Sequence, residues 1–206
     1  MSREVARRYP AREAKRTISI YCEGRNTERI YFNALKQKLR AGYIEIVSDK
    51  NQGLSVQAML KELKRRKKVG LISDEVYCVL DLDVYGDNHR EIISQLESWR
   101  PSRVRVVPSR PCFEYWLLSH FVRTDAPFIG TPGGKTACDQ LIDRLRAHVS
   151  DYDKSRSAVI RKFIEDDHLL RRGLENYAMC PQDPGNNPCT KVGTLVGYLL
   201  GLGDYT

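Results

Sequence analysis

Val76-Tyr-Cys-Val-Leu-Asp-Leu-Asp83 is the stretch that most constrains the fold of this chain. Its apolar residues predict a strand that is buried on both faces of a sheet. Two carboxylates, Asp81 and Asp83, follow at the end of that strand. Side chains two positions apart on an extended chain point the same way, so we expect both carboxylates to converge on one point. Such oxygen ligands suit a hard divalent cation, Mg²⁺ or Mn²⁺.

Strands and amphipathic helices alternate on both sides of this stretch. The segments that favour strands are residues 17–22, 43–47, 75–80 and 104–107. This β-α-β-α-β-α-β-α order predicts an α/β fold, with a parallel four-stranded sheet flanked by helices. Parallel sheets bind ligands at the carboxyl ends of their strands. Glu23 ends the first strand and Arg110 follows the fourth, so both fall on the same edge as the two aspartates.

The rest of the chain predicts a basic arm and a helical extension. Residues 1–16 carry six cations against two acids, and this net charge of +4 indicates an N-terminal arm. We expect the α/β domain over residues 17–123, and a loop followed by helices packed on that domain over residues 124–206. Gly134-Lys-Thr136 does not complete a phosphate-binding loop, because Ile129 stands where that motif needs glycine.

Composition indicates a globular protein of the cytoplasm. The chain has 206 residues, of which 41% are hydrophobic and 29% charged. Its apolar runs are far shorter than the roughly 20 residues that span a bilayer, and its start does not resemble a secretory signal, so we expect no membrane contact. The six cysteines form no CxxC pair and show no zinc-site spacing. We therefore expect reduced thiols and no disulfides.

Clustered positive charge indicates a nucleic-acid partner. The net charge is +8, and residues 61–68 place six cations beside one acid on a predicted helix. A basic surface beside an acidic pocket is what an enzyme acting on phosphodiesters needs, because cations hold the backbone while carboxylates hold metal. A solvated helix face has the same pattern, and this alternative stays open. The candidate nucleic-acid contacts are Arg25, Arg110, Lys64, Arg65 and Arg66.

Four motifs in order resemble the RloB family. They are Cys22-Glu-Gly-Arg-Asn-Thr-Glu28 with Tyr31-Phe32, Val79-Leu-Asp-Leu-Asp83, Ser109-Arg-Pro-Cys-Phe-Glu-Tyr-Trp-Leu-Leu-Ser-His-Phe121, and Asn187-Pro-x-Thr190-x-Val192. The resemblance covers most of the chain, from about Arg16 to its end. The family is Toprim-like and is associated with bacterial phage resistance and abortive infection. The resemblance therefore implies a Toprim-like, Rossmann-like fold.

The same resemblance implies roles for the acidic residues. Toprim enzymes use a strand-ending glutamate as general acid or base and an aspartate pair to bind magnesium during phosphodiester cleavage or transfer. Carried onto this sequence, Glu23 takes the acid–base or metal role, and Asp81 and Asp83 hold metal. Glu114 is a further metal candidate from its place in the third motif. The alternative is structural, because a dipole favours a carboxylate in the first turn of a helix and aspartates cap turns.

Two further roles have more than one candidate. Related Toprim nucleases use a downstream lysine to stabilise charge on the phosphate, and here Lys154 and Lys135 are the counterparts. A second metal ion would recruit another carboxylate, for which Asp87 and Glu28 are nearest in sequence.

These expectations combine into three hypotheses. The first is a Mg²⁺-dependent Toprim-type nuclease that cleaves DNA or RNA, tRNA included, in anti-phage defence. The second is a non-catalytic subunit that holds nucleic acid or nucleotide for a separate ATPase, since this chain has no ATP-binding loop of its own. The third is a helper that only contacts the ATPase. Whether the protein forms a homo-oligomer stays open.

Overall fold

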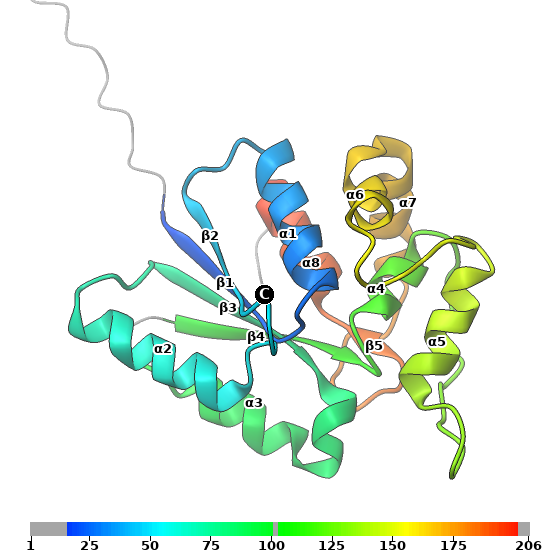
Figure 1. The fold of residues 1–206 in the computed structure, drawn as a ribbon, viewed down its shortest axis with the longest axis horizontal. Coiled ribbons are helices and arrows are strands. Elements are labelled where there is room, and N and C mark those ends of the chain that lie inside the picture. Colours follow the sequence, from blue (N-terminus) through cyan, green and yellow to red (C-terminus); the bar gives the residue numbers. More distant parts are fainter. Residues whose placement is uncertain (1–15, 101–102, 202–206) are drawn as a thin grey trace, which may run out of the picture.

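The structure, a computed structural model, describes residues 16–100 and 103–201 (Figure 1). Except for Arg16, the expected basic arm lies outside the described residues. The sheet has the order β2-β1-β3-β4-β5. Its strands are β1 (Ile18–Cys22), β2 (Ile44–Val47), β3 (Glu75–Asp81), β4 (Arg103–Arg110) and β5 (Cys189–Thr190). The first four are parallel, as the sequence predicts.

The prediction of four strands is wrong by one short strand. β5 pairs antiparallel with the end of β4, with Ser109 opposite Thr190 and Arg110 opposite Cys189. The hydroxyl groups of Ser109 and Thr190 also lie 2.9 Å apart. The sequence favoured the start of a helix here, because a strand of two residues is too short to show an alternating pattern.

Helices cover both faces of the sheet, which confirms the α/β class. In Figure 1, α2 and α3 lie below the sheet, and α1, α8 and the remaining helices lie above it and to the right. The bounds are α1 (Thr27–Lys38), α2 (Val56–Lys68), α3 (His89–Glu97), α4 (Glu114–Ser119), α5 (Ala137–Arg146), α6 (Ser157–Glu165), α7 (Asp167–Tyr177) and α8 (Val192–Leu199). A 3-10 helix over Leu82–Asn88 joins β3 to α3.

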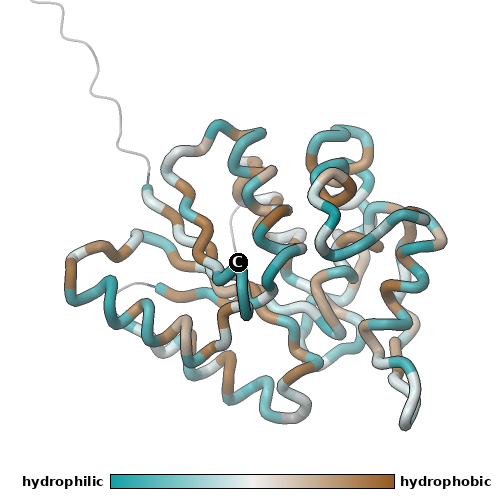
Figure 2. The backbone as a smooth tube through the Cα atoms, viewed as in Figure 1, coloured by the Kyte–Doolittle hydropathy of each residue, from teal (hydrophilic) through white to brown (hydrophobic). Residues whose placement is uncertain are grey.

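The central strand β3 has a core on each face. Val79 packs with α1 and the helices of the extension, whereas Cys78 and Leu80 pack against α2 and α3. Figure 2 shows the hydrophobic stretches that run along the strands, and the mixed hydropathy of the helices whose outer sides meet solvent. Burial on both sides explains why residues 76–80 are uninterruptedly apolar.

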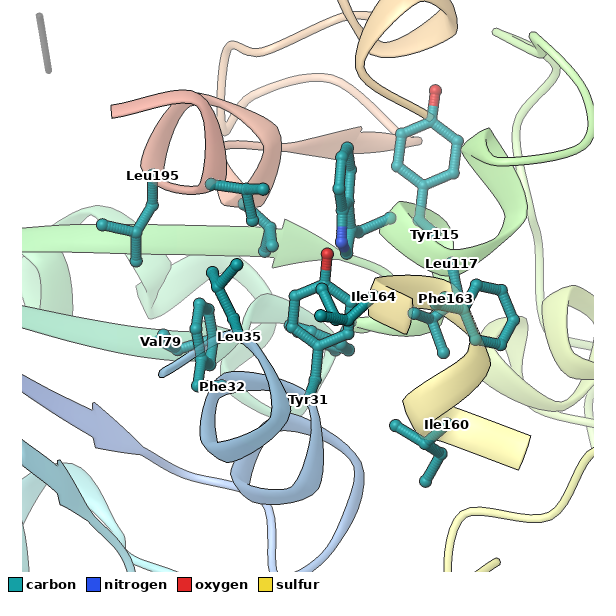
Figure 3. Close-up of a cluster of buried hydrophobic side chains, with 14 of the residues drawn as sticks. Tyr31, Phe32, Leu35, Val79, Tyr115, Leu117, Ile160, Phe163, Ile164 and Leu195 are labelled. Atoms are coloured by element: carbon teal, nitrogen blue, oxygen red, sulfur yellow. The ribbon is translucent and has the colours of Figure 1, made fainter. Parts of the chain in front are cut away.

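The C-terminal extension shares the core of the expected α/β domain. Phe163 of α6 and Leu195 of α8 belong to one buried cluster with Tyr31 and Phe32 of α1 (Figure 3). The extension also supplies β5 to the sheet. The boundary expected at residue 123 therefore does not divide the hydrophobic core, because α1 buries its apolar stripe against helices from beyond it.

One cysteine pair contradicts the expectation of reduced thiols. Cys112, in the turn before α4, and Cys138, in the first turn of α5, form a disulfide with their Cα atoms 5.8 Å apart. The pairing depends on the packing of α5 beside α4, which spacing along the sequence does not reveal. The other cysteines are free and buried: Cys22, Cys78, Cys180 and Cys189.

Within the described residues, no helix combines the length and the apolar character that a membrane span requires.

Candidate functional site

The candidate site lies where β1 and β3 end side by side. Asp81 is the last residue of β3, and Glu23 directly follows β1. The two strands are parallel and in register, with Cys22 opposite Val79, and the Glu23 amide donates to the Val79 carbonyl at 3.2 Å. The sheet therefore brings Glu23 and Asp81 to one edge, as the sequence predicts.

A pocket of about 260 Å³ opens at this edge. Its lining combines three carboxylates with one lysine and one arginine. The lining residues are Gly24, Arg25, Asn26, Thr27, Glu28, Asp81, Glu114 and Lys154. Five segments meet here: the turn after β1, the start of α1, the end of β3, the start of α4, and the loop between α5 and α6.

Three carboxyl groups share this confined space. Burial raises the pKa of Asp81 well above its ordinary value, and the negative charges of Glu28 and Glu114 raise it further. Burial, together with the charge of Glu114, raises the pKa of Glu28 from 4.5 to about 7. The arrangement holds Asp81 in place, because its Oδ1 accepts from the Phe113 amide at 2.9 Å. Asp81 and Glu28 therefore resist ionising beside the charge of Glu114.

Glu23 is fixed beside the pocket by two donors. The Asp81 amide donates to Glu23 Oε2 at 3.1 Å, and the Tyr85 hydroxyl donates to Oε1. Burial raises the pKa of Glu23, although both hydrogen bonds oppose that shift. Sequence reasoning missed Tyr85, whose only signal is an aromatic residue in the segment that follows the two aspartates.

Glu114 and Lys154 form an ion pair in the pocket. Lys154 Nζ lies 3.2 Å from Glu114 Oε2, and Glu114 is almost fully buried. Burial lowers the pKa of Lys154, but the charges of Glu114 and Asp81 outweigh it, so that this pKa is raised. The Thr27 hydroxyl at 3.1 Å and the Tyr152 hydroxyl at 2.8 Å donate to Glu114 Oε1. Sequence reasoning did not place Thr27 or Tyr152 among the candidate site residues.

The structure separates the other candidate lysine from the site. Lys135 pairs with Asp143 of α5 at 2.5 Å and is mostly exposed. Of the two lysines proposed from the sequence, Lys154 is therefore the one at the carboxylates.

Asp83 does not converge with Asp81. Asp83 is exposed and is not among the described residues that line the pocket. The chain leaves the extended conformation at Leu82, where the 3-10 helix begins, and Leu82 is buried. Alternation with a period of two ends there, so residues 81 and 83 no longer share a direction. The side chain of Asp87 lies outside the described part of the chain.

Gly24 explains how the turn after β1 accommodates Glu28. A Cβ atom at residue 24 would lie 2.0 Å from Glu28 Oε2. Glycine at this position therefore lets the carboxylate of Glu28 reach back across the turn.

The basic candidates fall into two groups: Arg25 and Arg110 lie at the carboxyl ends of strands, and the other three lie on α2. Arg25 lines the pocket and is exposed. Arg110 lies outside that lining, with its Nη2 3.5 Å from the Gly86 carbonyl. Arg65 and Arg66 lie on α2 and are occupied by carboxylates: Arg65 pairs with Glu62 at 2.6 Å, and Arg66 pairs with Glu62 at 2.8 Å and with Glu45 at 2.5 Å. Lys64 is exposed on the same helix.

Replacing Arg66 with glutamine is expected to lower the free energy of unfolding by about 1 kcal/mol. Arg66 joins α2 to β2 through Glu45, and only 14% of its side chain is exposed. Lys64→Gln on the same helix is the matched control and is expected to leave stability unchanged. Urea denaturation measures both variants, and an equal loss in the two would contradict a structural role for Arg66.

Residues 18–199 match the protein family described as RloB-like protein. The chain belongs to the RloB-like family. The match runs from the start of β1 to the end of α8, so the whole candidate site of this RloB-like protein lies within it. Comparison with curated proteins found no match, and comparison with solved structures found none either.

Proposed function

We propose that this RloB-like protein is a Mg²⁺-dependent nuclease whose strand-end carboxylates are arranged as in Toprim enzymes. The proposal rests on the crowding of Glu28, Asp81 and Glu114 in one pocket. Glu23 lies beside this pocket and accepts a hydrogen bond from the Asp81 amide. Like charges held together away from water cost free energy that a divalent cation offsets. A role in anti-phage defence rests on the family resemblance alone.

The donor set fits a hard cation. Asp81, Glu28 and Glu114 offer only carboxylate oxygens to the pocket, which Mg²⁺ and Mn²⁺ prefer. These three residues would hold the ion once their oxygens draw together, because among the described residues they do not all lie within 4.8 Å of one another. A bound ion would polarise a phosphoryl oxygen and supply an activated water.

The neighbouring residues complete the proposed chemistry. Glu23, with its raised pKa and its fixed orientation, would accept or return a proton. The Lys154 ammonium would stabilise negative charge that develops on the phosphate. Arg25, exposed at the pocket, would hold the phosphodiester backbone. Its guanidinium makes only one contact at 3.4 Å, to the Asn51 carbonyl, among the described residues.

A second candidate function is a nucleic-acid or nucleotide-binding subunit that works with an ATPase. The observation that favours it is that Glu114 already has three partners within the protein, Lys154, Thr27 and Tyr152. With these partners, the ion pair of Glu114 and Lys154 can stabilise the fold without taking part in catalysis.

Cleavage assays with purified protein separate the two candidates. Double-stranded DNA, single-stranded RNA and tRNA are incubated with Mg²⁺ or Mn²⁺, and with a chelator as the control. The nuclease proposal predicts cleavage that the chelator abolishes and that Glu23→Gln removes. Binding without cleavage of any of these substrates, in Mn²⁺ as in Mg²⁺, would overturn it in favour of the binding subunit.

Replacing Lys154 with methionine is expected to reduce cleavage by about a hundredfold. Methionine keeps an unbranched apolar side chain and removes the ammonium that faces Glu114. Lys135→Met, which removes a lysine paired with Asp143 instead, is expected to retain near-normal cleavage. Single-turnover rates and a thermal unfolding curve are measured for both. Equal losses in the two folded variants would contradict the assignment of Lys154.

A further inference from the structure

A mixed sulfur and oxygen cluster adjoins the pocket. One ligand atom each from Cys112, Cys138 and Glu114 lies within 4.8 Å of the other two. The sulfur of Cys138 is 3.9 Å from Glu114 Oε2 and 3.7 Å from Lys154 Nζ. In the disulfide, neither sulfur carries a proton or a negative charge, so these contacts leave the sulfurs without a strong polar partner.

We propose that the reduced Cys112–Cys138 pair and Glu114 form a binding site for a soft divalent cation of the Zn²⁺ class. A cellular dithiol would supply the reduction: its two thiols become a disulfide, the Cys112–Cys138 bond breaks, and two electrons and two protons pass to the cysteines. Binding of the cation then releases both thiol protons and forms two sulfur–metal bonds.

The geometry of the backbone suits this ligand set. Tetrahedral zinc with sulfur bonds of about 2.3 Å requires two sulfurs about 3.8 Å apart. A Cα–Cα separation of 5.8 Å allows that spacing by rotation of the side chains. Glu114 supplies a third ligand, and the fourth position stays open to water, as in zinc sites with three protein ligands.

The cluster shares Glu114 with the oxygen pocket beside it and differs from that pocket in its two sulfur ligands. Thiolates select Zn²⁺ over Mg²⁺, whereas Asp81 and Glu28 offer only oxygen. Cys138 is partly exposed and Cys112 is buried, which gives a reductant and a cation a way in from the Cys138 side.

Occupation of this site would compete with the ion pair in the pocket. Glu114 would turn from Lys154 towards the cation, and the Lys154 ammonium would be repelled by the cation's charge. Nearly half of the Lys154 side chain is exposed, so it is free to swing towards solvent. Any effect of this change on cleavage rests on the proposed nuclease function, whereas binding of the cation does not.

Titration with Cd²⁺ tests binding without reference to cleavage. The full chain is reduced with a phosphine, freed of excess reductant and titrated, with thiolate-to-metal charge-transfer absorption as the readout. We expect one Cd²⁺ per chain for the reduced protein, displacement of Cd²⁺ by Zn²⁺, and no signal for the oxidised protein. Glu114→Gln is expected to weaken binding by at least about tenfold, as loss of a ligand requires.

Two cysteine variants make the outcome decisive. The double variant Cys112→Ser and Cys138→Ser should lose the absorption, and Cys180→Ser, which alters a buried free cysteine outside the cluster, should keep it. If the reduced protein shows no thiolate absorption, or if the double variant binds Cd²⁺ as well as the unaltered chain does, the proposal is overturned and the pair is a disulfide only.

Discussion

Replacing Asp81 with asparagine is expected to abolish metal-dependent cleavage and, at the same time, to stabilise the metal-free protein above neutral pH. Asp81 lies among Glu28 and Glu114, and its Oδ1 is anchored by the Phe113 amide. Asparagine keeps an oxygen for that hydrogen bond but removes the charge that a cation requires. Charge stabilisation by a metal ion contributes several kcal/mol, so cleavage should fall by about a thousandfold or more.

The gain in stability follows from the same charges. An ionised Asp81 repels its neighbours in the folded state, whereas in the unfolded chain they are far apart and hydrated. Thermal unfolding at about pH 8 in a chelator should therefore give a higher midpoint for Asp81→Asn than for the unaltered protein.

Asp83→Asn is the matched control. Asp83 is exposed in the 3-10 helix and does not line the pocket, so its replacement should change cleavage and stability little. A loss of cleavage as large as that of Asp81→Asn would mean that Asp83 holds metal, as the sequence predicts. It would also require the 3-10 helix to rearrange when a substrate binds.

The sequence was sufficient to predict the edge of the sheet that carries the site. Buried strands alternate with amphipathic helices, and this pattern places Glu23 and Asp81 together, because parallel strands end on one side. The sequence indicates Glu28 as a candidate metal ligand only through its proximity to Glu23 along the chain. Its burial against Gly24 depends on the path of the turn, which periodicity does not encode.

Contacts between distant segments do not follow from periodicity, and the family resemblance names Lys154 only as one of two candidate lysines. Lys154 reaches Glu114 from a loop 40 positions further along the chain. The Cys112–Cys138 bond and the pairing of β5 with β4 depend in the same way on how the extension packs. The convergence expected of Asp83 with Asp81 assumes an extended chain through residue 83, whereas β3 ends at Asp81 and a 3-10 helix begins at Leu82.

The contribution of Glu28 to the free energy of unfolding of the metal-free protein is expected to fall as pH rises from about 4.5 to about 7, because Glu28 resists ionising in the folded state. Buried His120, whose pKa is lowered from 6.5 to about 4, contributes in the opposite direction over a similar range, so the Glu28 contribution is measured against Glu28→Gln. Burial and the charge of Glu114 raise the pKa of Glu28 from 4.5 to about 7. Between these values the folded protein keeps a proton that the unfolded chain releases. The contribution of Glu28 to stability is therefore fully present below its unfolded pKa of 4.5 and is lost as the pH rises through its folded pKa of about 7. The change amounts to about 3 kcal/mol.

Urea denaturation in a chelator at about pH 5 and about pH 8 measures this change. Glu28→Gln should match the unaltered protein at the lower pH, because glutamine resembles the protonated carboxyl group, and should exceed it at the higher pH. Mg²⁺ should restore stability to the unaltered protein at the higher pH, since it binds the ionised carboxylates of the folded state, and should do so less for Glu28→Gln. Equal stability of the unaltered protein and of Glu28→Gln at the higher pH would remove the electrostatic basis for placing a cation among Glu28, Asp81 and Glu114.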